Sequence, residues 1–145
     1  MSVIRRRSYG IVPYAIGGDG AVRFLLLRAF RNWDFPKGGA QGAETPLEAA
    51  RREMREETGI PDFEMPHGEA CIDTEPYAGG KVATYFVART RQRDLILPVN
   101  PELGRPEHDE FRWVAQEQAR RMLAVRLHPV LDWAASVIAG RDGAH

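Results

Sequence analysis

The sequence GGAQGAETPLEAARREMREETGI, residues 38–60, joins a glycine-rich loop to a strongly charged helix. Within it, three glutamates, Glu53, Glu56 and Glu57, follow Arg52 in one short run. An α-helix turns about 100° per residue, so Glu53 and Glu57 lie about 40° apart and one turn along, with Glu56 beside them. We therefore expect three carboxylates on one flank of a helix whose first turn follows a glycine-rich loop.

The two ends of this helix are marked by local signals. Thr45 is a good N-cap residue, and Glu48, three residues later, completes a capping box. Gly59 favours the left-handed conformation that stops a helix, and Pro61 follows it. These signals predict a helix over residues 46–58. Its apolar side chains form a separate stripe suited to packing on a sheet: Leu47, Ala50 and Met54.

The segments on either side of the helix are predicted to form strands and two further helices. Strands are expected over 9–16, 22–29, 69–76, 81–90 and 110–114, and helices over 116–125 and 129–139. A turn at 17–20 makes the first two strands a hairpin, and 32–43 and 98–106 are expected to be loops. This order predicts an α/β fold, a mixed sheet flanked by helices, in a single domain over 1–145 with a flexible arm at 1–7.

The composition is that of an ordinary globular protein. Of its 145 residues, 43% are hydrophobic and 28% charged, and the formal net charge is zero, so no overall field attracts nucleic acid or a membrane. Cys71 is the only cysteine, which fits a reducing cytoplasm, and we expect it to be a small buried residue. No apolar stretch is long enough to predict a membrane span. The oligomeric state is left open.

The clustered glutamates favour a site for a hard divalent cation. Three carboxylates this close repel one another unless a cation neutralises them. Mg²⁺ prefers carboxylate oxygens together with substrate phosphate, and Mn²⁺ accepts the same ligands. The alternative is a solvated helix in which arginines and glutamates pair, for example Arg52 with Glu56 four residues later. The composition of the run alone favours the solvated helix.

The wider pattern reverses this preference, because it resembles the signature of the Nudix hydrolases. That signature is G-x5-E-x7-R-E-U-x-E-E-x-G-U, where U is a bulky apolar residue. Here Gly38 and Glu44 supply its first two fixed positions and residues 52–60, REMREETGI, supply the rest. The resemblance implies a Nudix α/β/α sandwich and an enzyme that cleaves nucleoside diphosphate-linked substrates by attack of water on phosphorus.

The resemblance also implies the roles of individual residues. Glu53, Glu56 and Glu57 are expected to be metal ligands, joined by the carbonyl oxygen of Gly38. The general base is one of the glutamates, and Glu53 and Glu57 are both candidates.

Three further residues have expected roles. Arg52 resembles the residue that orients the glutamates by hydrogen bonds, and Glu44 resembles a structural partner of the loop. Glu107 follows Pro106 in a later loop and is the best candidate for an additional metal ligand or base. Its neighbour His108 is expected to be solvated.

The flanking sequences are similar to those of asymmetric diadenosine tetraphosphate hydrolases, a group within the same family. The similar stretches are WDFPKG at 33–38, KVATYF at 81–86 and EHDEFRW at 107–113. They imply a small-molecule substrate with a nucleotide polyphosphate chain, cleaved to ATP and AMP. Lys37 borders the glycine-rich loop and can contact a polyphosphate.

Lys81 and Tyr85 are further candidates for substrate binding. Residues four apart in a strand share a face, so the two side chains can clamp a phosphate and stack a base. The alternatives are that Lys37 is a solvated loop residue, that Tyr85 belongs to the core and that Lys81 is a charge at a strand end.

Other activities stay open. RNA 5′-pyrophosphohydrolases share the pattern W-x-F-P-x-G-G but carry glutamine where Lys37 stands, so RNA is expected as a partner only through its 5′ end. A nucleoside triphosphate or oxidised-nucleotide pyrophosphatase has the same chemistry. A binding or sensor module without turnover, and an interaction scaffold, belong to different functional classes. The complete set of glutamates argues against the binding module, and the scaffold predicts no metal-dependent change in melting temperature.

Overall fold

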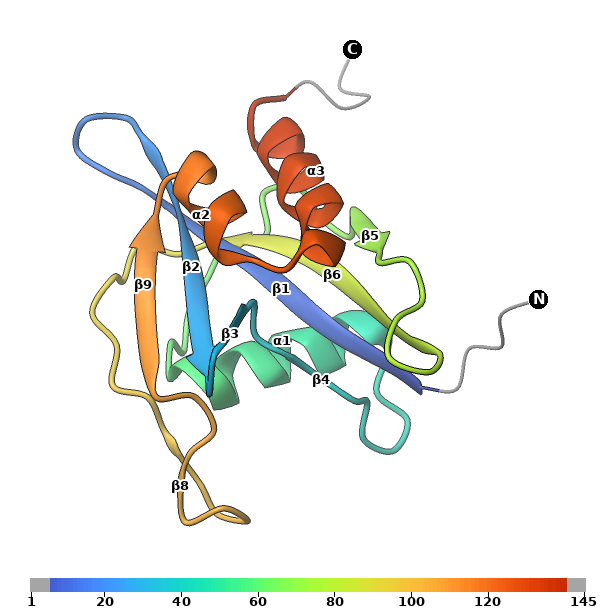
Figure 1. Ribbon diagram of the computed structural model, residues 1–145. Helices are drawn as coiled ribbons and strands as arrows, with labels where there is room; N and C mark the ends of the chain where they lie inside the picture. Colours follow the sequence, from blue (N-terminus) through green and yellow to red (C-terminus); the bar gives the residue numbers. More distant parts are fainter. Residues whose placement is uncertain (1–5, 141–145) are drawn as a thin grey trace.

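A computed structural model describes residues 6–140 of the chain (Figure 1). A seven-stranded sheet in the order β3-β2-β1-β6-β5 forms its centre, with β4 paired to β1 and β9 paired to β2. Its strands are β1 (Arg6–Ile16), β2 (Val22–Ala29), β3 (Asn32–Asp34), β4 (Lys37–Gly38), β5 (Cys71–Asp73), β6 (Lys81–Arg89) and β9 (Glu110–Val114). A separate two-stranded ribbon consists of β7 (Val99–Asn100) and β8 (Arg105–Pro106).

The sheet is mixed, as predicted. β1 and β2 form the expected antiparallel hairpin, while β1 runs parallel to β6 from Arg6 opposite Lys81 to Tyr14 opposite Arg89. Parallel strands need a long connection, and here it contains helix α1. β4 lies antiparallel to β1, with Lys37 opposite Gly10. This pairing fixes the start of the glycine-rich loop against the middle of the sheet.

Helices cover both faces of the sheet, so the predicted α/β/α sandwich is confirmed (Figure 1). Helix α1 (Pro46–Thr58) packs its apolar stripe on one face, where Ala50 and Met54 are fully buried against Ile11, Leu25 and Leu27. Helices α2 (Gln116–Met122) and α3 (His128–Ile138) cover the other face. Burial of large apolar side chains contributes about 1.5–3 kcal/mol each, so packing on the sheet stabilises the position of α1.

The predicted loops contain short strands that the sequence does not reveal. Residues 32–43 include β3 and β4, and 98–106 include the ribbon β7–β8. Elements of two or three residues are too short to show a hydrophobic period. Their backbone groups are paired because β2, β1 and the facing ribbon strand lie alongside, which is a tertiary effect.

Several predicted boundaries were wrong. The strand expected over 69–76 shrinks to β5, and the helix expected over 116–125 ends at Met122. Leu123 is extended there because it forms a bridge with Trp33, and a 3-10 turn at Val125–Leu127 leads into α3.

The N-terminal arm is also shorter than expected. Arg6 and Arg7 belong to β1, and Arg7 donates hydrogen bonds to Asp73 and Thr84, so these two residues are not part of a flexible arm. The rest of the predicted arm, residues 1–5, lies outside the described residues. Cys71 is exposed at the start of β5, contrary to the expected burial. Within residues 6–140, the structure has no helix that is both apolar enough and long enough to span a bilayer.

Candidate active site

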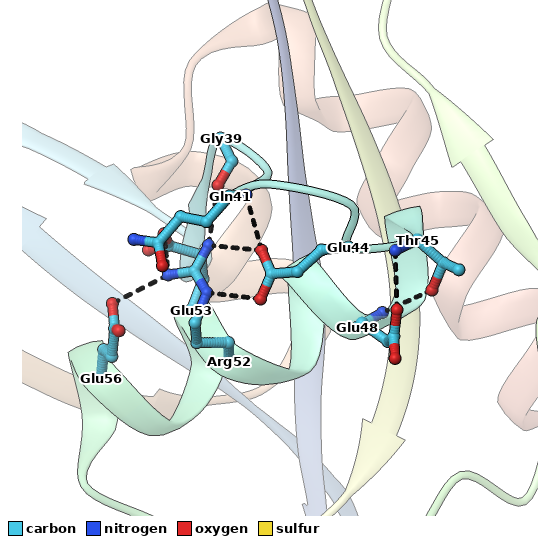
Figure 2. Close-up of polar contacts among 8 residues, drawn as sticks. All are labelled: Gly39, Gln41, Glu44, Thr45, Glu48, Arg52, Glu53 and Glu56. Atoms are coloured by element: carbon cyan, nitrogen blue, oxygen red, sulfur yellow. Dashed lines mark hydrogen bonds and ion pairs between the residues drawn. The ribbon is translucent and has the colours of Figure 1, made fainter.

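Arg52 is the centre of a polar network at the glycine-rich loop (Figure 2). Its Nε and Nη2 donate to the two carboxylate oxygens of Glu44 at 2.8 and 3.0 Å, and Nη2 also donates to the carbonyl oxygen of Gly39 at 2.8 Å. Its Nη1 donates to Glu53 at 2.8 Å and to Glu56 at 3.0 Å. The guanidinium therefore holds two of the three signature glutamates in place, and the i,i+4 pair with Glu56 that the sequence suggested is present.

Glu44 fastens the loop to the helix. Its carboxylate accepts one hydrogen bond from Arg52 on each oxygen, and Oε1 also accepts a hydrogen bond from the backbone N–H of Gln41 at 2.7 Å. The hydrogen bond from Arg52 lowers the pKa of Glu44, so this carboxylate stays ionised near neutral pH. The predicted capping box between Thr45 and Glu48 closes the first turn of α1 just after the loop (Figure 2).

Gly38 is the point where the loop meets the glutamates. A Cβ added at this position would collide with the carboxylate of Glu53, so only glycine allows that carboxylate to lie against the backbone of β4. The neighbouring Gly39 has open space around its Cα. The close approach explains why a glycine at residue 38 matters for the arrangement of the acidic side chains.

Glu57 is an ionisable group in an environment that disfavours its charge. Its side chain is 5% exposed, and its Oε2 atom is buried without a hydrogen-bond partner among the residues that the structure describes. Burial raises the pKa of Glu57 well above its ordinary value, and the nearby carboxylates of Glu53 and Glu107 add to the effect. A buried polar atom without a partner costs stability, so this carboxylate suits a ligand that the protein itself does not supply.

Glu107 and His108 lie next to Glu57. One ligand atom from each of the three side chains falls within 4.8 Å of the others. The Nδ1 atom of His108 is 3.7 Å from Glu57 and 4.0 Å from Glu107, and it too is buried without a hydrogen-bond partner in the described part of the chain. Burial lowers the pKa of His108, which favours the neutral ring. The expectation that His108 is solvated was therefore wrong.

The position of His108 depends on the loop that precedes β9. The backbone N–H of Asp109 donates to the carbonyl oxygen of Arg28 at 2.9 Å, which fixes the loop against β2. This contact between residues far apart in the chain turns His108 inward. No local signal in the sequence distinguishes an inward from an outward histidine here.

The residues present fit a divalent cation. The oxygens of Glu53, Glu56, Glu57 and Glu107 are ligands that Mg²⁺ and Mn²⁺ prefer, and the unpartnered oxygen of Glu57 indicates a missing positive partner. The imidazole of His108 adds a nitrogen donor, which Mn²⁺ accepts more readily than Mg²⁺ does.

Two clefts meet at these carboxylates. The smaller cleft, about 560 Å³, lies between the glutamates and the β7–β8 ribbon. The larger cleft, about 830 Å³, is lined by β3 and by the segment between α2 and α3. Glu57 and Glu107 line both clefts. A ligand that extends through both must therefore pass directly over these two side chains.

Lys37 lines the larger cleft and is paired with Asp34. The distance from its Nζ atom to Oδ2 of Asp34 is 3.4 Å, and both side chains are largely buried. Burial acts against the charge of Lys37, but the charge and hydrogen bond of Asp34, together with Tyr77 and Glu57, outweigh it, so the pKa of Lys37 is raised and the ammonium group is retained. Lys37 therefore presents a positive charge in the cleft, a position compatible with phosphate binding.

The proposed pair of Lys81 and Tyr85 is separated by burial. Tyr85 is 0% exposed, packs edge-to-face on Phe35 and donates its hydroxyl hydrogen to Oδ1 of Asp34 at 2.9 Å. Its ring is a core group and has no free face for a nucleobase, so the stacking part of the prediction was wrong. Lys81 is exposed at the first residue of β6 and lines neither cleft within the described residues.

Comparisons with known proteins place this arrangement in a family. Residues 4–134 match the NUDIX domain. The chain is 30% identical over 98 residues to an RNA pyrophosphohydrolase of Shewanella sediminis, a match that covers 58% of this chain and 56% of that protein. It is also 30% identical to an RNA pyrophosphohydrolase of Halorhodospira halophila, with 75% and 66% of the two chains covered. The chain thus spans little more than half the length of the first of these relatives.

Solved structures show the same fold over nearly the whole chain. A crystal structure of a Caenorhabditis elegans Ap4A hydrolase binary complex superposes with a TM-score of 0.76 and 25% identity, and the match covers 92% of this chain and 98% of that one. The match to the domain takes in the loop, helix α1 and the acidic side chains described above. Because the NUDIX domain matches residues 4–134, the chain belongs to the NUDIX domain family.

Proposed function

We propose that the protein is a divalent-metal-dependent hydrolase of phosphoric anhydride bonds, with dinucleoside polyphosphates as its substrates. Diadenosine tetraphosphate, cleaved to ATP and AMP, is the representative reaction. The observation that carries this proposal is the place of Glu57, a buried carboxylate with an unpartnered oxygen, at the junction of two clefts. The membership of this chain in the NUDIX domain family supports the same chemistry.

Each acidic residue has a part in holding the ion. Glu53, Glu56 and Glu57 are the proposed ligands, together with the carbonyl oxygen of Gly38, and Glu107 is an additional one. A bound Mg²⁺ or Mn²⁺ would neutralise charge on the phosphates and lower the pKa of a water molecule. The protein's own contribution is to fix the carboxylates before substrate arrives.

Arg52 holds the metal-binding carboxylates from one side. Its hydrogen bonds to Glu53 and Glu56 hold two carboxylates, while Glu44 holds the guanidinium. The proton acceptor is one of Glu53, Glu57 and Glu107. Burial raises the pKa of both Glu57 and Glu107, which makes each a better acceptor than an ordinary carboxylate.

The two clefts support a substrate with two ends. Together they extend to either side of the carboxylates, with room for one nucleoside moiety in each. Lys37, proposed to contact the polyphosphate chain, lies in the larger cleft. Lys81 is proposed as a more distant phosphate contact, since the turn before it carries Tyr77, which also lines that cleft. The likeness to an Ap4A hydrolase over nearly the whole chain points the same way.

A second candidate is removal of pyrophosphate from RNA 5′ ends. It is favoured by the RNA pyrophosphohydrolases among the relatives, which share about 30% identity with this chain. A 5′-triphosphate presents the same anhydride chemistry, and the cleft that holds Lys37 is open to solvent on the side of Phe30, which is 80% exposed. The two candidates differ in what lies beyond the phosphates.

A product-resolved substrate panel separates the candidates. Wild type is incubated with Mg²⁺ and diadenosine tetraphosphate, ATP, an oxidised nucleoside triphosphate or 5′-triphosphate RNA, and the products are identified by chromatography. The proposal requires that kcat/KM be largest for the dinucleotide. A larger value for RNA would favour the second candidate, and absence of turnover on the whole panel with Mg²⁺ or Mn²⁺ would favour a binding module.

A further inference from the structure

Arg126 is a cation in the wall of the larger cleft that the sequence gave no reason to single out. It belongs to the 3-10 turn Val125–Leu127 between α2 and α3. Its guanidinium carbon lies 4.1 Å from the centre of the Tyr77 ring, and its Nη2 atom lies 3.5 Å from Oδ2 of Asp34. A guanidinium held by an aromatic face and a carboxylate has lost most of its freedom before any ligand arrives.

Asp34 joins Arg126 to Lys37. Its Oδ1 atom accepts hydrogen bonds from the backbone N–H of Phe35 at 2.6 Å and from the Tyr85 hydroxyl at 2.9 Å, so the carboxylate cannot rotate freely. Its Oδ2 atom faces both cations, at 3.4 Å from Lys37 and 3.5 Å from Arg126. Because Nζ of Lys37 and Nη2 of Arg126 approach the same oxygen atom, the two positive charges lie close together in the wall of the cleft.

Lys37 and Arg126 share one carboxylate oxygen, and within residues 6–140 Arg126 keeps an unused donor. Asp34 is the carboxylate that faces both cations, while Glu57 and Glu107 line the same cleft toward the acidic cluster. The unused donor is Nη1 of Arg126, which is buried and has no hydrogen-bond partner among the residues that the structure describes. A buried cationic donor without an acceptor calls for an anionic ligand.

The geometry points to a phosphate subsite formed by Lys37 and Arg126, with Asp34 as the residue that positions both. Its ligand is the part of a polyphosphate chain that extends from the acidic cluster into the larger cleft, which rests on the proposed function. Arginine offers two donors in a fixed plane to phosphate oxygens, and lysine supplies a point charge. The pair therefore favours a substrate with several phosphoryl groups over one with a short diphosphate link.

Kinetics on long and short substrates test this subsite. KM and kcat are measured for wild type, Arg126→Ala, Arg126→Lys and the control Arg121→Ala on diadenosine tetraphosphate and on ADP-ribose, with Mg²⁺. Arg121 is an exposed arginine on α2 that is paired with Glu117 outside the cleft. Losing a charged hydrogen bond costs about tenfold in binding, so KM for the tetraphosphate should rise about tenfold in Arg126→Ala and less in Arg126→Lys.

The control and the short substrate give the test its contrast. In Arg126→Ala we expect kcat to change little and KM for ADP-ribose to rise less than KM for the tetraphosphate. The control Arg121→Ala should resemble wild type on both substrates. Equal KM values for Arg126→Ala and Arg121→Ala on the tetraphosphate would overturn the subsite. Arg126→Gln, which keeps much of the side chain packed on Tyr77, replaces Arg126→Ala if that variant does not fold.

A binding measurement separates failure of the subsite from failure of the proposed function. The dissociation constant of a methylene-bridged ATP analogue with Mg²⁺ is determined by calorimetry for the same variants. If wild type hydrolyses neither substrate, the proposed function fails, and a weaker binding of the analogue to Arg126→Ala than to Arg121→Ala still supports the subsite. Unchanged binding in Arg126→Ala overturns it.

The role of Asp34 has its own readout. Asp34→Asn introduced alone should raise KM for the tetraphosphate. Introduced together with Arg126→Ala, it should raise KM much less beyond the value for Arg126→Ala, because the two changes remove the same contact. Fully additive effects of the two substitutions on KM would show that Asp34 does not act through Arg126.

Discussion

Arg52 and Glu44 form a two-point contact between helix α1 and the loop before it, with Nε–Oε2 at 2.8 Å and Nη2–Oε1 at 3.0 Å. The contact sets the plane of the guanidinium and leaves Nη1 free to reach Glu53 and Glu56. The glutamate that the resemblance assigned to the loop and the arginine assigned to the acidic cluster thus act as one unit.

The pH dependence of stability should report on this contact. Arg52 lowers the pKa of Glu44 in the folded protein, so the stabilisation is present above the ordinary pKa of glutamate and is lost as pH falls through the lowered value. We expect Glu44→Gln to be less stable than wild type in urea unfolding at about pH 7, with the difference shrinking toward about pH 3. A difference that stays constant over this range would contradict the assignment.

Arg52→Lys should separate charge from geometry. Lysine keeps the positive charge but lacks the planar donors that bind Glu44 and Glu53 together. Loss of a residue that orients metal ligands typically costs about 10–100-fold in metal affinity or activity, and we expect kcat/KM to fall in that range. Circular dichroism should show an unchanged fold. Activity equal to that of wild type would show that charge alone is sufficient.

Gly38→Ala should disturb the acidic cluster directly. The added Cβ collides with the carboxylate of Glu53, so that side chain must move and the affinity for Mg²⁺, measured by calorimetry, should fall about tenfold or more. Gly39→Ala is the matched control, because a Cβ meets nothing within 4 Å at that position. Similar Mg²⁺ affinities for the two variants would argue against the role given to Gly38.

Glu57→Gln should stabilise the metal-free protein while it abolishes turnover. The substitution removes a buried charge that burial and two nearby carboxylates disfavour, so the Tm without metal should rise by about 2–4 °C. Addition of Mg²⁺ should raise the Tm of wild type but not that of the variant. A lower Tm for metal-free Glu57→Gln would mean that the carboxylate has a stabilising partner in the folded state.

Local features of the sequence were sufficient to predict helix α1 and its acidic flank. The capping box and Gly59 lie within or next to the helix, and its bounds, 46–58, are those predicted. The clustering of Glu53 and Glu57 follows from helical geometry alone. The hairpin of β1 and β2 was predicted in the same way, from a turn between two apolar runs.

Features that depend on contacts between distant segments were not predicted. Strand periodicity places Lys81 and Tyr85 on one face of β6 but does not say that α2 and α3 bury that face, which is why Tyr85 lies in the core. His108 turns inward because its loop is fixed to β2. Arg126 and Asp34 meet only when the C-terminal helices pack on the sheet.

The central claim is that the acidic cluster around Glu57, loaded with a divalent cation, hydrolyses a phosphoric anhydride. The most direct test is the time course of ATP and AMP release from diadenosine tetraphosphate, followed by chromatography for wild type and Glu57→Gln, with Mg²⁺ and with EDTA. The account predicts equal amounts of ATP and AMP from wild type with Mg²⁺, and neither product with EDTA or from the variant. Release that persists in EDTA, or at the wild-type rate in Glu57→Gln, would contradict it.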